Sequence, residues 1–320
     1  MLYSFVKILA RLALPIYCRT IAINKKELLK QKGPLLLAVN HPNSFLDAII
    51  LCTLFEGTVY SLARGDAFKN KFFARFLYLF KMFPVYRVSE GVENLDENYK
   101  TFELCKNVFK QNGIVLIFSE GRCINEWHLR PLKKGTARLA ISSWEEGIDL
   151  TVLPIALNYN SFKKFGKNIK MFFGDPITKA DIDYKNTHGN ALRQFNETLN
   201  QQLAEHIFEI NNTDKIALQK AFYIRQPLLK KILLGVPAAI GLLIHAPLYL
   251  LIKWISDGLI KEPGHDDSKI VGFLLVLYPV FLFVFSFSLF YFTGNWLSFL
   301  SLLLLPFTAW AFVQLKKQMD

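Results

Sequence analysis

Cysteine is scarce in this chain of 320 residues, and the four cysteines present are scattered. Cys18, Cys52, Cys105 and Cys123 form no C-x-x-C pair, and no histidine cluster accompanies them. This pattern argues against a disulfide framework or a metal site. It favours a reducing, cytosolic setting for the part of the chain that carries the thiols.

Two other signals are missing. The N-terminus has Lys7 and Arg11 inside its apolar stretch and no clean small-residue cleavage site, so we do not expect a removed signal peptide. The chain also has no clustered run of five or more basic residues and no recognised nucleic-acid motif. We therefore expect no nucleic-acid partner.

Positive charge is abundant and unevenly placed. The net charge is +12, and residues 228–320 hold seven lysines against five acidic residues. The difference of +2 there leaves +10 for residues 1–227. A basic surface of this kind suits phosphate-bearing partners, including anionic lipid headgroups and phosphorylated substrates.

Long apolar runs dominate the C-terminal third. Residues 232–255, 270–292 and 296–313 are each close to the roughly 20 residues that cross a bilayer, which predicts a membrane region over 228–320. Three full spans would place Lys316 and Lys317 opposite the basic domain, which the positive-inside rule disfavours. Two spans with a re-entrant or interfacial third piece are the alternative.

The first residues predict a different relation to the bilayer. Lys7 and Arg11 are four apart and share one helical face, while Phe5, Ile8, Leu9 and Leu12 lie on the other side. Residues 1–24 therefore form a membrane-interface helical segment. A helix that packs on the core is the alternative.

Between these ends, strand and helix patterns alternate. Short apolar runs at 34–40, 58–63, 114–118 and 151–157 predict buried strands, and 44–55, 68–82, 95–111 and 134–145 predict helices. A further strand over 171–173 and a polar helix over 189–210 follow. Residues 25–215 thus form an α/β layered domain with a mostly parallel central sheet.

The segment from Asn40 to Asp47 reads NHPNSFLD and joins the first strand of this domain to its first helix. His41 there can take a proton from an alcohol, and Asp47 can orient the imidazole and stabilise its charged form. Ser44-x-x-Asp47 also reads as a capping box for the helix. The eight residues alone leave both readings open.

Other polar residues follow predicted strands. Glu120 can accept hydrogen bonds from substrate hydroxyls, and Gly121 lets a ligand approach the backbone. Arg122 follows directly, and Lys133 lies before a helix N-terminus that could bind an anion.

Two arginines and a proline complete the candidate set. Arg64 and Arg87 each end a strand-like run, where a guanidinium suits bidentate phosphate binding. Pro154 could shape an acyl pocket or mark a strand edge. Each has an ordinary alternative as surface charge, turn or strand residue.

The ordered set resembles the PlsC-type glycerolipid acyltransferases over about residues 25–180. The resemblance lies in four blocks, of which the first and third are the specific ones: His41…Asp47, Phe83-Pro84-Val85-Tyr86-Arg87, Phe118-Ser119-Glu120-Gly121 and Val152-Leu153-Pro154-Ile155. Five residues separate His41 from Asp47, where four are common in the family. The five-residue form resembles the fungal-type glycerol-3-phosphate/dihydroxyacetone-phosphate acyltransferases and their bacterial relatives.

The resemblance implies roles for these residues. His41 would be the general base, Asp47 its partner, Arg87 and Arg64 the holders of an acceptor phosphate, and Glu120 with Gly121 the glycerol site. Arg122 stands where threonine or glycine is common, Ser119 replaces a proline, and Lys81 replaces a glycine, which loosens the acceptor assignment. Pro154 would lie near the acyl chain.

The implied reaction is acyl transfer from acyl-CoA or acyl-ACP to a hydroxyl of glycerol phosphate or lysophosphatidate, without a metal or prosthetic group. The implied partners are the lipid bilayer, the thioester donor, the glycerophospholipid acceptor and acyl carrier protein. We expect a membrane protein with its catalytic domain on the cytoplasmic face, most simply of a bacterial inner membrane. A lyso-aminolipid acceptor and, more remotely, a non-enzymatic binder of anionic ligands are the alternatives.

Overall fold

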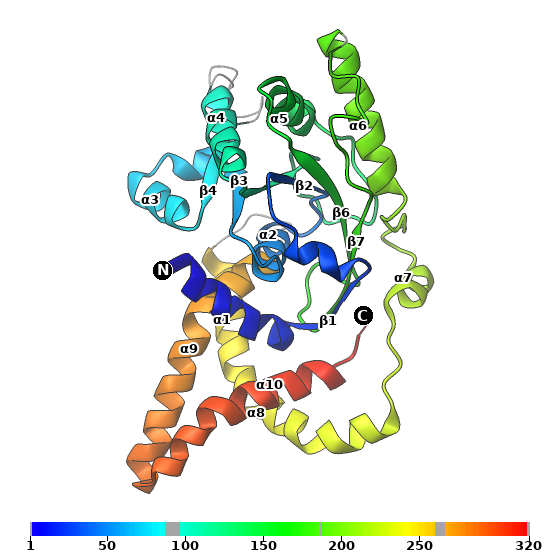
Figure 1. The fold of residues 1–320 in the computed structure, drawn as a ribbon. Coiled ribbons are helices and arrows are strands. Elements are labelled where there is room, and N and C mark those ends of the chain that lie inside the picture. The colour runs from blue at the N-terminus through cyan, green and yellow to red at the C-terminus, as the bar shows by residue number, and fades with distance from the viewer. Residues whose placement is uncertain (1, 87–96, 186, 260–265, 319–320) are drawn as a thin grey trace.

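The computed structural model of the chain describes residues 2–86, 97–185, 187–259 and 266–318. Within them, seven strands form one sheet in the order β1-β7-β6-β2-β5-β3-β4 (Figure 1). All neighbours pair in parallel except β6 and β7, so β1 and β7 run opposite to the other five. The strands are β1 (Cys18–Ile23), β2 (Leu35–Val39), β3 (Val59–Arg64), β4 (Met82–Val85), β5 (Ile114–Phe118), β6 (Thr151–Tyr159) and β7 (Lys167–Phe173).

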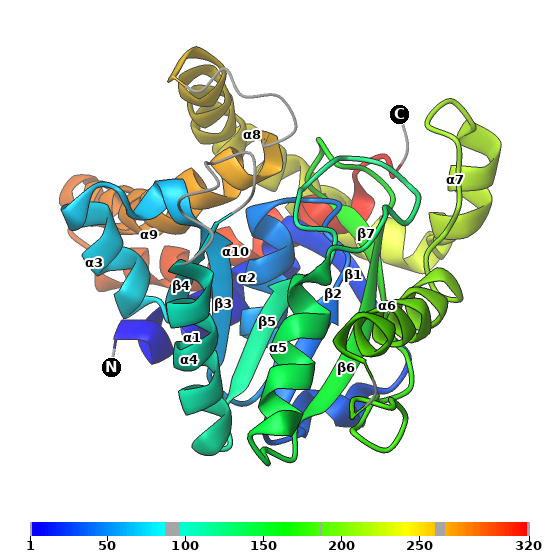
Figure 2. The ribbon, with the colours of Figure 1, turned by 90° about the horizontal axis from the view of Figure 1, so that it is seen from above.

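Helices cover both faces of the sheet. Helices α4, α5 and α6 lie on one face, and α1, α2 and the C-terminal helices lie on the other (Figure 2). The helices are α1 (Leu2–Tyr17), α2 (Phe45–Leu54), α3 (Lys71–Leu79), α4 (Glu97–Lys110), α5 (Lys134–Glu145), α6 (His188–Ala204), α7 (Lys215–Phe222), α8 (Leu228–Leu259), α9 (Asp266–Thr293) and α10 (Ser301–Leu315).

The central strand β2 shows why the sheet is buried on both sides. Its five residues are all apolar and fully buried. Successive side chains of a strand point to opposite faces. Accordingly Leu35, Leu37 and Val39 join the apolar core against α1 and α2, while Leu36 and Ala38 join the core against α4, α5 and α6. The predicted α/β fold with a mostly parallel sheet is confirmed.

The two basic side chains of helix α1 form hydrogen bonds with the α/β domain. Lys7 Nζ donates to the carbonyls of Glu56 and Gly57, and Arg11 Nε donates to the carbonyl of Thr53, all at the C-terminal end of α2. Thr53 lies in the last turn of α2, and Glu56 and Gly57 follow the end of the helix. Some apolar residues of α1 are exposed, namely Leu2, Phe5, Ile8 and Leu12, whereas Ala10, Leu14 and Tyr17 are buried.

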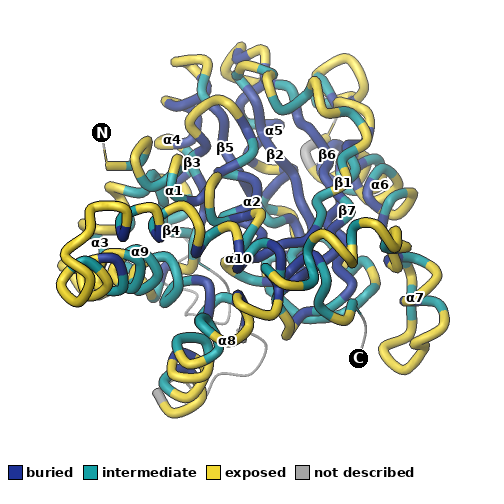
Figure 3. The backbone as a smooth tube through the Cα atoms, turned by 90° about the horizontal axis from the view of Figure 1, so that it is seen from below, coloured by how far each residue is buried: buried dark blue, intermediate teal, exposed yellow. Residues whose placement is uncertain are grey.

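Many apolar residues of the C-terminal helices are exposed or half-buried, as the yellow and teal stretches of the tube in Figure 3 show. Within the described residues, three are long and apolar enough to cross a bilayer: Leu228–Gly258, Asp267–Thr293 and Trp296–Leu315. Both ends of the α9–α10 segment touch the α/β domain. Asp267 contacts Asn43, and Arg19 of β1 donates to the carbonyls of Val313 and Gln314 at the end of α10.

The sheet extends beyond its predicted limits. Strand β1 pairs with β7, so the sheet begins before residue 25, where the sequence placed the start of the domain. Helix α7, at Lys215–Phe222, was not predicted from the sequence. Strand β6 lies inside the sheet, which makes the reading of Pro154 as an edge-strand marker wrong.

Candidate active site

Residues 40–47, which we call the catalytic turn after their predicted role, connect β2 to α2 at the carboxyl edge of the sheet. Asn40 fixes its first residue: the side chain donates to the carbonyl of Leu157 at 3.0 Å and accepts from the amide of Leu157 at 2.8 Å. The amide side chain thus continues the β2–β6 pairing for one more step. The chain then turns away from the sheet with the next residue, His41, in a defined place.

His41 and Asp47 are in contact. His41 Nδ1 lies 3.0 Å from Asp47 Oδ2. Asp47 is fully buried, whereas the His41 side chain is 15% exposed. Because Nδ1 faces the carboxylate, the tautomer that donates from Nδ1 leaves Nε2 as the proton acceptor.

Two further donors hold the Asp47 carboxylate. The hydroxyl of Tyr159 at the end of β6 donates to Oδ1 at 2.6 Å, and the amide of Asn43 donates to Oδ2 at 2.8 Å. Burial, followed by the nearby charge of Asp47, raises the pKa of Tyr159 well above its ordinary value, so its hydroxyl stays protonated and donates. Three donors around one carboxylate fix its orientation toward His41.

Ser44, within the five residues that separate His41 from Asp47, has an unusual backbone conformation. This residue has φ +52°, a conformation that residues other than glycine rarely adopt. The predicted capping box is wrong in its first half, because the Ser44 side chain makes no capping bond to α2. Its second half is displaced by one residue: Asp47 accepts from Asn43 rather than from Ser44.

Phe118, the last residue of β5, supports the imidazole from one side. The two rings are stacked, with centroids 3.7 Å apart and planes 12° apart. The ring of His41 therefore has one packed face and one contacted nitrogen, which limits its rotation.

Glu120 contacts the catalytic turn through its side chain. It is 4% exposed, and its carboxylate accepts from the amide of His41 at 2.9 Å and from the amide of Arg130 at 3.1 Å. Burial raises the pKa of Glu120, and these two amides oppose the rise. The structure therefore gives Glu120 a contact that positions the catalytic turn; its predicted contact with the acceptor stays a prediction.

Gly121 and Lys133 lie together beside Glu120. Gly121 has φ +65°, and a Cβ added there would lie 3.0 Å from Lys133 Cγ. The positive φ favours glycine at this position, and a Cβ there would also require the Lys133 side chain to shift slightly. The amide of Lys133 donates to the carbonyl of Ser119 at 2.8 Å. Lys133 and Arg122 are both exposed and flank this end of the sheet.

The remaining predicted residues are more distant from the relay. Arg64 ends β3 and binds Asp66 with its guanidinium. Pro154 is buried in β6, paired with Ala38, three residues before His41. Arg87 lies outside the described residues.

Two residues of the site were missed from the sequence: Tyr159 and Asn40. Asn40 was read only as the end of a strand, although an amide after a buried strand often continues backbone pairing. Tyr159 could be found only by recognising that β6 extends past 157 to the same edge of the sheet.

One thiol, that of Cys123, lies beside the catalytic turn. Cys123 accepts from the amide of Ser44 at 3.0 Å, and burial raises its pKa to about 12.

The described residues contain no group of three histidine, cysteine, aspartate or glutamate side chains that could hold a metal ion. The expectation that the protein works without a metal or prosthetic group stays a prediction.

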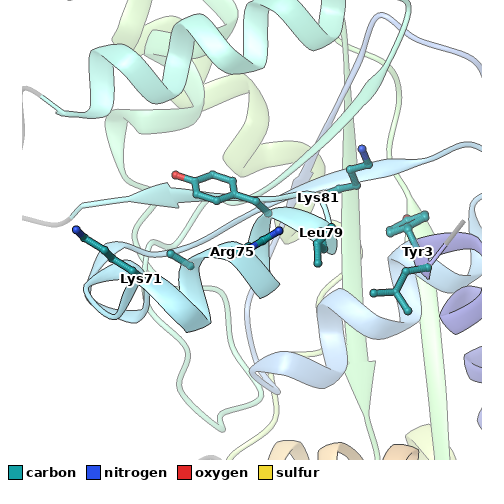
Figure 4. A pocket seen from close by; sticks show the side chains of 8 residues that line it. Tyr3, Lys71, Arg75, Leu79 and Lys81 are labelled. Carbon is teal, nitrogen blue, oxygen red and sulfur yellow. The ribbon is translucent and has the colours of Figure 1, made fainter.

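A hollow of about 600 Å³ lies elsewhere, between α1 and α3 (Figure 4). Tyr3 and Leu79 line it together with the cations Lys71, Arg75 and Lys81. Helix α3 has no buried residue, and its aromatic side chains are exposed. This hollow contains no residue of the catalytic turn.

Comparison with known proteins addresses the family. Residues 20–158 match the family described as Acyltransferase, a range that holds the catalytic turn, Glu120 and Pro154. The matched range is less than half of the 320 residues, so it shows an acyltransferase-type domain within the chain. The PlsC-type resemblance that the sequence blocks predicted is therefore confirmed, and the protein is an enzyme.

Two individual proteins are similar to this chain. A 1-acyl-sn-glycerol-3-phosphate acyltransferase of Bacillus subtilis is 26% identical over 186 residues, which are 58% of this acyltransferase and 87% of the relative. The crystal structure of the 1-acyl-sn-glycerophosphate (LPA) acyltransferase PlsC from Thermotoga maritima is 12% identical, with a TM-score of 0.45, and the match covers 70% of this chain and 81% of that one.

Proposed function

We propose that this acyltransferase moves a fatty acyl group from a thioester, acyl-CoA or acyl-ACP, to a hydroxyl of glycerol phosphate or lysophosphatidate. The single observation that carries the proposal is the relay itself. His41 Nδ1 contacts a buried carboxylate held by Tyr159 and Asn43, which leaves Nε2 to act on a substrate hydroxyl. A base held in this way is suited to this reaction.

The proton path follows from the geometry. Nε2 of His41 takes the hydroxyl proton while the hydroxyl oxygen forms a bond to the thioester carbonyl carbon. Asp47 stabilises the imidazolium that results. The tetrahedral intermediate then breaks its carbon–sulfur bond, and the leaving thiolate takes the proton back from Nε2. The products are an ester and a free thiol.

The cations near the relay support a phosphate acceptor. Lys133 and Arg122 are exposed beside Gly121, and the start of α5 follows Lys133 directly. A helix N-terminus and free cations together suit an anion. Arg64 already binds Asp66, so its guanidinium would have to divide its contacts between that carboxylate and a phosphate. This contact favours keeping a lyso-aminolipid as the second candidate acceptor.

The lipid bilayer is the proposed partner of the exposed apolar surfaces. The first and last turns of the α9–α10 segment both contact the α/β domain, which supports an outward and a returning crossing. Lys316, whose carbonyl accepts from Arg19, then lies on the domain's side, in keeping with the positive-inside rule. We propose that this side is cytoplasmic and that α1 lies along the membrane surface.

The test is thiol release by the purified full chain in detergent, with palmitoyl-CoA or palmitoyl-ACP and a panel of lyso-acceptors. Mass spectrometry of the lipids identifies the acceptor. We expect His41→Ala to lower kcat on the order of 10²–10⁴-fold. His206→Ala is the matched control, because His206 stacks on Phe172 outside the relay. Full activity of His41→Ala would rule out the proposed base.

A further inference from the structure

The start of helix α9 reaches the catalytic turn from the membrane region. The side-chain amide of Asn43 donates to Asp267 Oδ2 at 2.9 Å. The backbone amide of Phe45 donates to Ser268 Oγ at 3.0 Å. These two contacts flank Ser44, the residue with the positive φ, so consecutive residues of α9 hold the turn on both sides of its unusual backbone.

Asn43 connects this clamp to the relay. Its side chain is bound to Asp267, and its own backbone amide donates to Asp47 Oδ2 at 2.8 Å. The same carboxylate oxygen contacts His41 Nδ1. Fixing the Asn43 side chain therefore fixes one of the donors that orient Asp47, and Asn43 itself is only 1% exposed.

Asp267 is held in turn by the α/β domain. It forms an ion pair with Lys167 of β7 and accepts from the hydroxyl of Tyr17 of α1 at 2.7 Å. Lys167 also lies over the ring of Tyr159, 5.9 Å from its centroid. Ile270 and Val271 of the next turn belong to the same apolar core as β2 and α2.

A charge pair buried this completely is a weak source of stability, because both ions lose their hydration. Lys167 and Asp267 have side chains that are fully buried. The best attested use of such a pair is to specify one arrangement of the parts that carry it. The arrangement specified here is the position of α9 against the catalytic turn.

We propose that the first turn of α9, through Asp267 and Ser268, is a positioning element of the active site, so that the membrane region sets the geometry of His41 and Asp47. This inference rests on the proposed acyl transfer. Asp267 and Ser268 are positioning residues that act through Asn43 and Phe45, not groups that touch the substrate. The C-terminal region then has a role in turnover beyond anchoring.

The experiment uses the full chain in detergent, with the donor and acceptor on which the wild type turns over fastest. Ser268→Ala removes the acceptor for the Phe45 amide, and Ser268→Thr keeps it. Asn43→Ala removes the contact to Asp267 while leaving the ion pair with Lys167 in place. Ser286→Ala is the matched control, because Ser286 is a buried serine of the same helix that bonds to Leu282 and Ser301.

We expect Ser268→Ala and Asn43→Ala each to lower kcat about tenfold, with KM for both substrates within twofold of wild type. Ser268→Thr should restore most of kcat, and Ser286→Ala should match wild type. Tm in detergent identifies a variant that fails to fold. If one of the two variants misfolds, the other still tests the inference. Wild-type kcat in both folded variants, or a change confined to KM, would overturn the inference. An inactive wild type would instead contradict the proposed function.

Discussion

The α/β domain and the C-terminal helices are built from similar apolar residues that meet opposite surroundings. Leu35 to Val39 of β2 are fully buried, whereas Phe287 and Phe292 of α9 are 57% and 83% exposed. The first set is buried within the protein, and the second lies on a helix long and apolar enough to cross a bilayer. The two regions meet at the first turn of α9, where the contacts are polar and lie against the catalytic turn.

Helix α1 shows the same contrast within one element. Lys7 and Arg11 point inward to carbonyls of α2, while Ile8 and Leu12 point outward. A helix of a soluble domain normally has the reverse arrangement. Leu14 and Tyr17 of the same helix are buried in the core, so α1 packs on the α/β domain and also exposes apolar residues, and its contact with a membrane surface stays a prediction.

Removing the C-terminal region should have the largest effect on both stability and activity, and it tests whether the two regions depend on each other. A chain ending at residue 227 loses Asp267, which leaves the buried ammonium of Lys167 without its partner. An unpaired buried charge costs about 3–5 kcal/mol, a large share of an ordinary stability. We expect aggregation on size-exclusion chromatography and no thiol release. A monodisperse, active 1–227 chain would show that the two regions are independent.

Tyr159→Phe tests the buried side of the comparison. It removes one donor to Asp47 and leaves the carboxylate with the amide of Asn43 and His41. Hydrogen bonds to charged groups contribute about 1.5–3 kcal/mol, so kcat should fall at least about tenfold. The measurement is thiol release under saturating substrates, with Tyr223→Phe, an exposed tyrosine, as the control. Equal kcat values would remove Tyr159 from the relay.

The double variant Ile8→Asp/Leu12→Asp tests the exposed side. These residues are 56% and 66% exposed, so the fold and Tm should be preserved. Turnover on acceptor in anionic vesicles should fall about fivefold, because apolar burial in the interface is lost, while turnover on a short-chain soluble acceptor stays unchanged. Ile216→Asp on α7, 81% exposed, is the control. An equal loss with both acceptors would place α1 in catalysis rather than at the membrane.

The smallest effect is expected at the thiols. Burial raises the pKa of Cys18, Cys52, Cys105 and Cys123 to about 12, so at pH 8 nearly all remain protonated. Iodoacetamide at pH 8 should leave activity unchanged over an hour, and mass spectrometry should find little alkylation before denaturation. Rapid, activity-destroying alkylation would mean that a thiolate lies near the substrate.

Local patterns predicted most of the fold because the buried strands and apolar helices each carry a clear period. The relay pair was predicted because His41 and Asp47 are close in the chain. Tyr159, Lys167 and Asp267 were missed because they meet only in three dimensions, from β6, β7 and α9. A sequence shows no sign of which distant charges share one buried site.

Asp47→Asn is the most direct test of the central claim that the relay is intact despite its five-residue spacing. The amide has the same size and can still accept from Tyr159, so the fold should be unchanged, but its charge and the orientation it imposes on His41 are lost. We predict that kcat falls by about 10²–10⁴-fold with little change in KM. A kcat within threefold of wild type would contradict the relay.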